Sequence, residues 1–326
     1  MLSRTKPELS KSEIQNIFSE ACLGTVKSAK KLGDGEYNAV YDVITDMGNY
    51  VLKVSPLDKT KVLTYEQDMM RGEVFWYAQL RTHTNIKVPY VYYKDFSHKI
   101  YPADFFIMEK MKGEQLNNAK LSPDEKLWCR QEIGKMTAYM HKITNNQYGY
   151  LQNKLHDNWY LAYKSMVSNL IADAERANRK SRNGRKLLKY ADKYKDVLEK
   201  VPCVMVNFDL WYGNILCVRN NSSIELILID PERTLWGDPI MDFANLEFEK
   251  MLNRKTVSID SYNSVSKAKI KCTRDEMIRF AFGIGYLGLV MEVEKYYRYS
   301  PRYFGWWRNI ASSRLLYTNA FKILNE

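Results

Sequence analysis

The chain has 326 residues, of which 45% are apolar and 27% are charged. This composition excludes a disordered, collagen-like or small disulfide-stapled protein, and the length suffices for two folded units. No apolar run approaches the ~20 residues of a membrane span, and the N-terminus lacks the apolar stretch of a secretory signal. Five scattered cysteines without C-x-x-C spacing indicate reduced thiols, so we expect a cytoplasmic protein.

The net charge of +11 favours acidic ligands or nucleic acid as partners. Much of this charge lies between Glu175 and Lys200, where ten residues are basic and four are acidic. A helix with a solvated basic face explains this stretch, with a candidate break at residues 181–184. Because no RNA-binding module accompanies it, nucleic acid is not an expected partner, and an RNA-binding protein stays a third interpretation.

Residues 1–111 are predicted to form a small mixed lobe. Residues 37–44 are rich in aromatic and β-branched side chains, and a turn over 46–49 connects them to a second strand over 50–54. These two strands form a hairpin. The pattern then predicts a helix over 64–80 and strands over 88–95 and 105–108, followed by a break at Lys112 and Gly113.

Residues 112–326 are predicted to be mainly helical. Ser122, Pro123 and Glu125 form the pattern of a capping box, which starts a helix that we extend to residue 143. Further helices are expected over residues 158–176, 185–198, 239–251, 274–297 and 306–324. Between them, residues 204–229 form one short β segment that carries the candidate catalytic groups.

The pattern D-x-x-x-x-N begins at Asp209 and ends at Asn214, between two apolar strands. Asp230 ends the second strand. Turn-forming residues 220–223 predict a hairpin in which paired residue numbers sum to about 443, so Asn214 and Asp230 should lie nearly opposite, with Cα atoms roughly 5 Å apart. An amide oxygen and a carboxylate at that separation suit Mg²⁺, and Asp209 beside them suits a proton acceptor.

At this point the sequence resembles the aminoglycoside phosphotransferase and choline kinase-like family, which shares the protein-kinase fold. The family's I-D-x-E segment corresponds to residues 229–232, and its D-P-x-x-D motif to residues 238–242. The resemblance extends from about Lys31 to Phe248. It implies an α+β fold with two lobes, a small β-rich N-terminal lobe and a larger helical C-terminal lobe.

The resemblance also implies the roles of individual residues in a kinase that uses ATP or GTP with Mg²⁺. Asp209 is then the catalytic base, and Asn214 and Asp230 are the metal ligands. The remaining positions bind the nucleotide, through the loop between the first strands, the phosphate lysine with its helix partner, and the hinge. These residues are Gly33, Asp34, Gly35, Asn38, Lys53, Glu73, Glu109 and Met111.

Several of these residues also have a purely structural explanation. The Gly33–Gly35 segment is neither a G-x-G-x-x-G motif nor a P-loop and has the composition of an ordinary turn. Lys53 could snorkel from a sheet edge, and Glu66 is a rival partner for it on the same predicted helix. We expect His141 to be packed and hydrogen-bonded, and Asp242 to fix a loop rather than bind metal.

One departure from the family pattern stands at Asn207, where the family has a histidine two residues before the base. This side chain supports the loop without reacting, so a nucleotide-binding pseudokinase without turnover is the alternative function. No A-P-E segment follows residue 230, so a protein substrate is not expected. We therefore expect a small hydroxyl compound, such as an aminoglycoside, amino alcohol or sugar, no membrane partner, and a monomer or homodimer.

Overall fold

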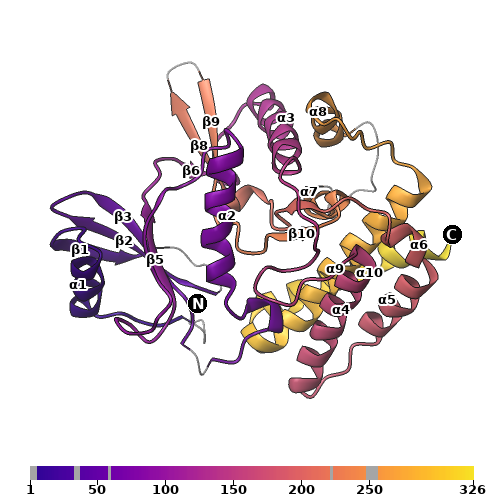
Figure 1. Cartoon of the computed structure of the whole chain (residues 1–326), viewed down its shortest axis with the longest axis horizontal. Coiled ribbons are helices and arrows are strands. Elements are labelled where there is room, and N and C mark those ends of the chain that lie inside the picture. Colours follow the sequence, from indigo (N-terminus) through magenta and orange to yellow (C-terminus); the bar gives the residue numbers. More distant parts are fainter. Residues whose placement is uncertain (1–5, 33–36, 58–59, 221–222, 247–255) are drawn as a thin grey trace.

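The computed structural model describes all residues except 1–5, 33–36, 58–59, 221–222 and 247–255. A β-sheet with two helices occupies the N-terminal end of the molecule, and the helices of the C-terminal part lie beside it (Figure 1). No helix among the described residues has both the length and the apolar composition needed to cross a bilayer. The expected α+β architecture of two unequal regions is confirmed.

Five antiparallel strands form the N-terminal sheet in the order β1-β2-β3-β5-β4. Their bounds are β1 Val26–Lys31, β2 Ala39–Thr45, β3 Asn49–Val54, β4 Val91–Asp95 and β5 Phe105–Glu109. The predicted hairpin is therefore confirmed, whereas the predicted strand over 88–95 begins three residues later. Neighbouring residues of β5 alternate between faces, because Phe106 packs in one hydrophobic cluster and Phe105 and Ile107 pack in another.

Each face of this sheet is covered by one helix. The first, α1 (Lys11–Glu20), was not predicted, although Ser10 and Glu13 form its capping box. The single helix predicted over 64–80 is wrong: a 3₁₀ turn, η1 (Thr64–Glu66), precedes α2 (Met69–His83). Asp68 between them has a φ of +55°, and a left-handed residue cannot continue a right-handed helix.

The C-terminal region is mainly helical, as predicted. Its longer helices are α3 Pro123–Met140, α4 Trp159–Arg176, α5 Arg182–Lys193, α8 Val257–Val265, α9 Arg274–Arg298 and α10 Phe304–Asn325. The capping box at Ser122 is confirmed, whereas α8 was not predicted.

Three of the helices predicted in this region differ from the structure in their bounds by at least three residues. The helix extended to residue 143 ends at Met140. The helix predicted over 185–198 begins at Arg182, because Ser181 caps it, and it is interrupted at Tyr194 before α6 (Lys195–Leu198). The segment predicted as a helix over 239–251 starts as a 3₁₀ turn, η3 (Pro239–Asp242), and continues as α7 (Phe243–Leu246). Residues 247–251 lie outside the described part of the chain.

The β segment of this region forms two small sheets. A hairpin of β8 (Ile215–Asn220) and β9 (Ser223–Leu228) is joined at one edge by β6 (Glu114–Gln115). Every recorded pair in the hairpin sums to 443, from Ile215 with Leu228 to Asn220 with Ser223. The predicted register is thus confirmed, although its tip at 221–222 lies outside the described residues. The second sheet pairs β7 (Val204–Val206) with β10 (Leu235–Gly237).

The hydrophobic cores are not divided at the proposed lobe boundary. One cluster joins α1 to the sheet, whereas the larger cluster extends from α2 through the whole helical region. The boundary that we propose at 111–112 lies between β5 and β6. The helix α2 therefore connects the two regions by packing as well as by sequence.

Candidate active site

The segment from Asn207 to Asn214 is held in place by a buried carboxylate. Asp242 accepts hydrogen bonds from the backbone amides of Asn207 (3.3 Å) and Phe208 (2.8 Å). His141 lies 3.0 Å from the same carboxylate through Nε2 and 3.0 Å from the Tyr262 hydroxyl through Nδ1. Both residues thus have the structural roles expected from the sequence: Asp242 fixes the loop, and His141 orients Asp242.

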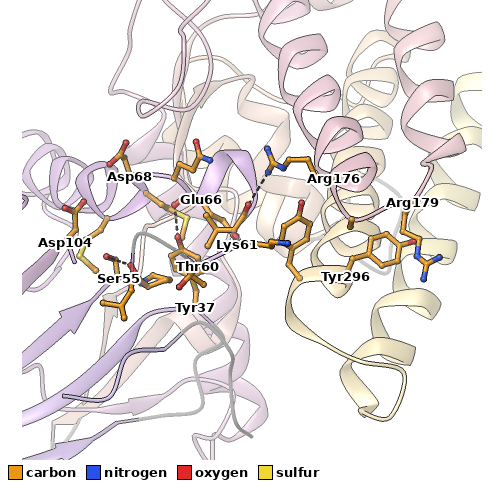
Figure 2. Close-up of a pocket in the computed structure, with 18 of the residues that line it drawn as sticks. Tyr37, Ser55, Thr60, Lys61, Glu66, Asp68, Asp104, Arg176, Arg179 and Tyr296 are labelled. Atoms are coloured by element: carbon orange, nitrogen blue, oxygen red, sulfur yellow. Dashed lines mark hydrogen bonds between the residues drawn. The ribbon is translucent and has the colours of Figure 1, made fainter. Parts of the chain in front are cut away.

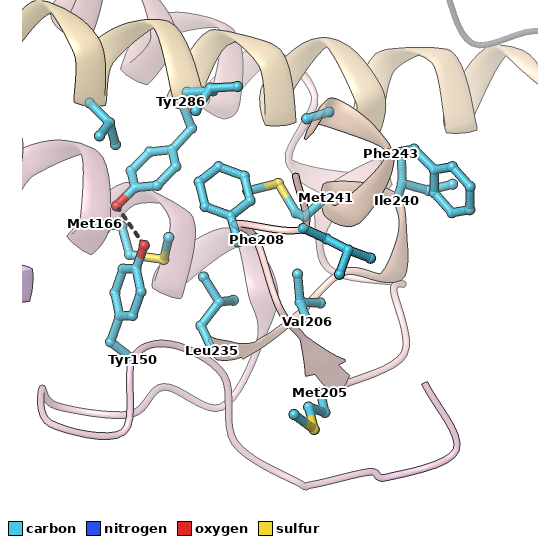
Figure 3. Close-up of a cluster of buried hydrophobic side chains, with 14 of the residues drawn as sticks. Tyr150, Met166, Met205, Val206, Phe208, Leu235, Ile240, Met241, Phe243 and Tyr286 are labelled. Carbon is cyan, nitrogen blue, oxygen red and sulfur yellow. Dashed lines mark hydrogen bonds between the residues drawn. The ribbon is translucent and has the colours of Figure 1, made fainter. Parts of the chain in front are cut away.

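The buried side chain of Phe208 holds the same loop in place by apolar packing. Phe208 is fully buried with a φ of +55°, and its ring lies near Tyr286, at a centroid distance of 5.5 Å. Figure 3 shows this ring between Tyr286 and Met241, with Val206 and Leu235 of the small sheet beneath it. Asn245 also donates to the Phe208 carbonyl at 2.7 Å. The strained backbone at Phe208 is therefore fixed on several sides.

The geometry brings Asp209 and Asn214 into direct contact. The Asn214 side-chain amide donates to the Asp209 carboxylate and to its backbone carbonyl, both at 3.0 Å. The side-chain oxygen of Asn207 accepts the Asp209 amide proton at 3.0 Å. Burial raises the pKa of Asp209 to about 6, against the opposing charge of Arg233. A half-buried carboxylate with this pKa is suited to accept a proton near neutral pH.

Lys53, in the central strand β3, lies at the centre of a second polar cluster. Its ammonium group contacts Glu73 of α2 at 2.7 Å, Glu232 at 3.2 Å, and Asp230. Its side chain is only 4% exposed. Burial alone would lower the pKa of Lys53, but the three carboxylates outweigh it and raise that pKa well above the ordinary value. Lys53 is therefore a charged group in an interior ion cluster and does not snorkel from an edge.

Glu73, and not Glu66, is the helix partner of Lys53. Glu66 is buried and pairs instead with Arg298 of α9. Arg298 also contacts Glu294 at 2.5 Å, and Glu294 contacts Arg233 at 2.9 Å. Sequence reasoning missed this chain of ion pairs, because its members are up to 232 residues apart. It connects the segment before α2 to the residue that follows Glu232.

The carboxyl groups of Glu73, Asp230 and Glu232 lie within 4.8 Å of one another. Glu232 belongs to the I-D-x-E segment but is not among the predicted site residues. The signal that could have found it is its position two residues after Asp230, since alternate residues of an extended segment share a side. Asp230 has a φ of +59° and donates its backbone amide to the Tyr77 hydroxyl at 2.8 Å.

The two clusters are joined through the hairpin. The backbone carbonyl of Asn214 accepts the Ile229 amide at 2.9 Å, so Asp230 follows the residue that lies opposite Asn214. The negative charge of Asp230 also contributes to the raised pKa of Asp209, although less than burial does. Asp209, Asn214, Lys53 and Asp230 therefore belong to one site.

The structure describes only some of the other residues that are predicted to bind the nucleotide. Gly33, Asp34 and Gly35 lie outside the described residues. Asn38 is buried and donates its side-chain amide to Glu232 at 3.0 Å. Glu109 ends β5 and donates its backbone amide to the Tyr90 carbonyl at 2.7 Å. The backbone amide of Met111 has no hydrogen-bond partner within the part of the chain that the structure describes.

Comparison with known proteins gives the family of the chain. A family described as "Phosphotransferase enzyme family" matches residues 28–248. No curated protein sequence matches the chain significantly.

Several solved structures have the same fold at low sequence identity. A candidate fructosamine-3-kinase from Haemophilus somnus 129PT superposes with a TM-score of 0.65 at 17% identity, covering 94% of this chain and 96% of the other. The GDP complex of wild-type aminoglycoside 2'-phosphotransferase-IIIa gives 0.64 at 13% identity, with 97% and 99% covered. ADP-bound aminoglycoside phosphotransferase APH(2'')-Ib gives 0.61 at 17%, again with 97% and 99% covered.

These structures confirm the protein-kinase-like fold that the resemblance implied. The matched residues 28–248 include Lys53, Asp209, Asn214 and Asp230, so the segment that carries the family pattern also holds the two joined clusters. Since this match spans more than half of the sequence, the chain belongs to the phosphotransferase enzyme family.

Proposed function

We propose that this phosphotransferase moves the γ-phosphoryl group of ATP or GTP, with Mg²⁺, to a hydroxyl group of a small molecule. The observation that carries the proposal is the joined pair of clusters: Asp209 is held beside Asn214, and Lys53 is held beside Asp230. Phosphoryl transfer relies on positioning and charge neutralisation, and these residues supply both.

Nucleotide binding is supported by the residues around Lys53 and by the end of β5. The Lys53 ammonium group contacts Glu73 and Asp230, and in the proposed function it also contacts phosphate oxygens. The backbone amide of Met111, which has no partner among the described residues, suits the edge of a nucleotide base. Two of the structural neighbours were solved with GDP or ADP bound, which agrees with a nucleotide as the phosphoryl donor.

The donor set also fits a divalent cation. Glu73, Asp230 and Glu232 share the single ammonium group of Lys53, so the described cluster has more carboxylates than cations. Oxygen ligands of this kind are those that Mg²⁺ prefers. Asp230, whose side chain is 39% exposed, and the amide oxygen of Asn214 would hold the ion. When bound, Mg²⁺ supplies charge neutralisation of the nucleotide phosphates.

In the proposed step, Asp209 orients the acceptor hydroxyl and accepts its proton. The acceptor oxygen forms a bond to the γ-phosphorus as the bond to the β-phosphate oxygen breaks, so the products are a phosphate monoester and a nucleoside diphosphate. Lys53 neutralises charge on the phosphates throughout. Asn207, the departure from the family pattern, still supports the loop, because its side-chain oxygen binds the Asp209 amide.

The experiment that tests this function measures the release of ADP or GDP from MgATP or MgGTP in the presence of each compound in a panel of hydroxyl compounds. We expect at least one amino alcohol, sugar or aminoglycoside to stimulate release above the rate with water alone. Thermal unfolding with each nucleotide gives an independent readout, since a ligand at 100 times its Kd adds about 2.7 kcal/mol. Nucleotide binding without stimulation by any compound would favour the pseudokinase alternative, and no binding at all would contradict both.

A further inference from the structure

A pocket of about 1430 Å³ lies between the segment that precedes α2 and the ends of helices α4 and α9 (Figure 2). Its lining includes Tyr37 and Glu66 at one side and Tyr296 and Trp306 at the other. This volume is larger than most small-molecule sites require. None of the roles described above uses the pocket, so its chemistry is a separate source of information about the acceptor.

One side of the pocket lies near the proposed reaction centre, which consists of Lys53, Glu73, Asp209, Asn214, Asp230 and Glu232. The Tyr37 hydroxyl donates to the Glu66 backbone carbonyl at 2.8 Å, and Arg298 lies 5.9 Å from the centre of the Tyr37 ring. Through Glu294, Arg298 is connected to Arg233, which follows Glu232 in the chain. Asn38, which follows Tyr37 in the chain, donates its side-chain amide to Glu232 at 3.0 Å, so the Tyr37 side of the pocket is next to a residue that contacts the Lys53 cluster.

Each acidic side chain of the lining contacts a basic one, although Asp68 and Asp104 share Arg71. Glu66 pairs with Arg298, and Asp68 pairs with Arg71 at 3.3 Å. Asp104 contacts Arg71 at 3.1 Å and His98 at 2.8 Å. In Figure 2, Asp68 and Asp104 lie on the side of the sheet, away from the arginines of the helical wall. Each of these carboxylates therefore already has a basic partner among the described residues.

The basic side chains of the lining are not neutralised to the same degree. Arg176 pairs with Asp173 at 2.6 Å, but within the described residues neither Lys61 nor Arg179 has a carboxylate partner. Both are exposed at the pocket wall. Counted together with these ion-pair partners, the described lining residues have a small excess of positive charge.

Part of this positive charge lies near Tyr296. The Arg179 guanidinium lies 5.8 Å from the centre of the Tyr296 ring, and Trp306 contacts that ring edge-on at 5.6 Å. Burial lowers the pKa of Lys295 beside them, and the charges of Arg314 and Arg179 lower it further, against Glu292. The aromatic rings offer a flat apolar surface next to the cations, which suits a sugar ring.

We propose that the acceptor is a sugar or polyol that carries an anionic group, a carboxylate or a phosphate, which Lys61 and Arg179 bind in this pocket. This inference rests on the proposed function, because it identifies the acceptor class of the same site. The uncompensated cations disfavour a polycation such as an aminoglycoside, although solved relatives of this fold are aminoglycoside phosphotransferases. An anion bound to an arginine gains charge-assisted hydrogen bonds.

The test uses matched sugars that share a ring and differ in charge: D-glucose, D-glucosamine, D-glucuronate and D-glucose 6-phosphate. Calorimetric titration in the presence of MgADP measures the Kd of each. We expect the two anionic sugars to bind at least about tenfold more tightly than the neutral and amino sugars, since a hydrogen bond to a charged group is worth ~1.5–3 kcal/mol. Comparison of the Kd of D-glucuronate with that of D-glucose 6-phosphate shows whether the site prefers a carboxylate or a phosphate.

The double variant Lys61→Glu, Arg179→Glu should remove this preference, with at least about a tenfold rise in the Kd of the anionic sugars. The double variant Lys126→Glu, Lys189→Glu is the matched control, because it changes the net charge equally at exposed positions outside the pocket. Anionic sugars that do not bind, that bind no better than glucosamine, or that bind unchanged in the pocket variant overturn the proposal. Failure of the proposed function is distinguishable, because the unaltered chain would then bind neither MgATP nor MgGTP, or would bind them without phosphoryl transfer to any compound.

Discussion

The reaction centre and the pocket wall are built in opposite ways. Around Lys53 and Asp209, nearly every charged or polar group is fixed by a partner, and most are buried. At the pocket wall, Lys61 and Arg179 are exposed and have no carboxylate partner among the described residues. Preorganised groups are suited to stabilising a reaction that is the same for every acceptor, whereas unpaired groups remain available to choose one. Substitutions at the centre should therefore alter chemistry and folding, and substitutions at the wall should alter acceptor choice.

The largest expected effect follows from Asp209→Ala. Loss of the proton acceptor should lower turnover by roughly 10²–10⁴-fold, which is the usual contribution of a positioned acid or base. Steady-state kinetics with a stimulating acceptor measure the change, and Asp196→Ala, at an exposed position on α6, is the control. Near-normal turnover in Asp209→Ala would remove Asp209 from the proposed role.

Lys53→Met should lower stability as well as activity. It leaves Glu73, Asp230 and Glu232 without their shared cation, and breaking a buried ion pair reduces the free energy of unfolding by about 3–5 kcal/mol. Chemical denaturation at neutral pH measures this loss. Lys87→Met, which removes an exposed pair with Glu225, should change the free energy of unfolding by less than about 1 kcal/mol.

The same variant should regain stability as the solution is acidified. Burial raises the pKa of Glu232 to about 7, above the ordinary carboxyl value, so the folded state takes up protons before the unfolded state does. The free energy of unfolding should therefore increase as the pH falls through this region, and the absence of Lys53 raises the pKa further. A loss of stability that is independent of pH would contradict uncompensated carboxylates as its cause.

The pH dependence of turnover should report Asp209. Because its pKa is about 6 and the base acts when deprotonated, kcat/KM should fall about tenfold per pH unit below that value and level off above it. Arg233→Met removes a charge that lowers this pKa, so the inflection should move to higher pH. An inflection that does not move would show that another group controls the profile.

The smallest effect is expected at Asn207. Its side-chain oxygen binds the Asp209 amide, whereas its side-chain nitrogen is buried without a partner in the described structure. Asn207→Ala removes one hydrogen bond and should lower the free energy of unfolding by about 1 kcal/mol. Thermal or chemical unfolding measures this change. Turnover that falls as far as in Asp209→Ala would mean that Asn207 takes part in the reaction.

Much of the reaction centre was predictable because its spacing is local. Asp209, Asn214 and Asp230 lie within 22 residues of sequence, and the register of a hairpin depends on its turn and on alternation along two adjacent strands. The capping box at Ser122 is equally local, and both predictions are confirmed. The break at Asp68 and the helix α8 escaped because single-residue conformations and weakly patterned helices give little sequence signal. The helix α1 was missed although its capping box at Ser10 and Glu13 is a local signal.

The sequence by itself determined the family, through its resemblance to the family's motifs, and also the two-region architecture and the spacing of the proposed catalytic residues, since these are encoded in local patterns. Only the tertiary structure decided which carboxylates meet Lys53, why Glu66 is not among them, and which cations face the pocket. Apart from Lys53 and Glu73, which are 20 residues apart, the ion pairs among those contacts join residues more than 170 positions apart. Packing brings such segments together through the shape and burial of whole elements, which no local pattern specifies.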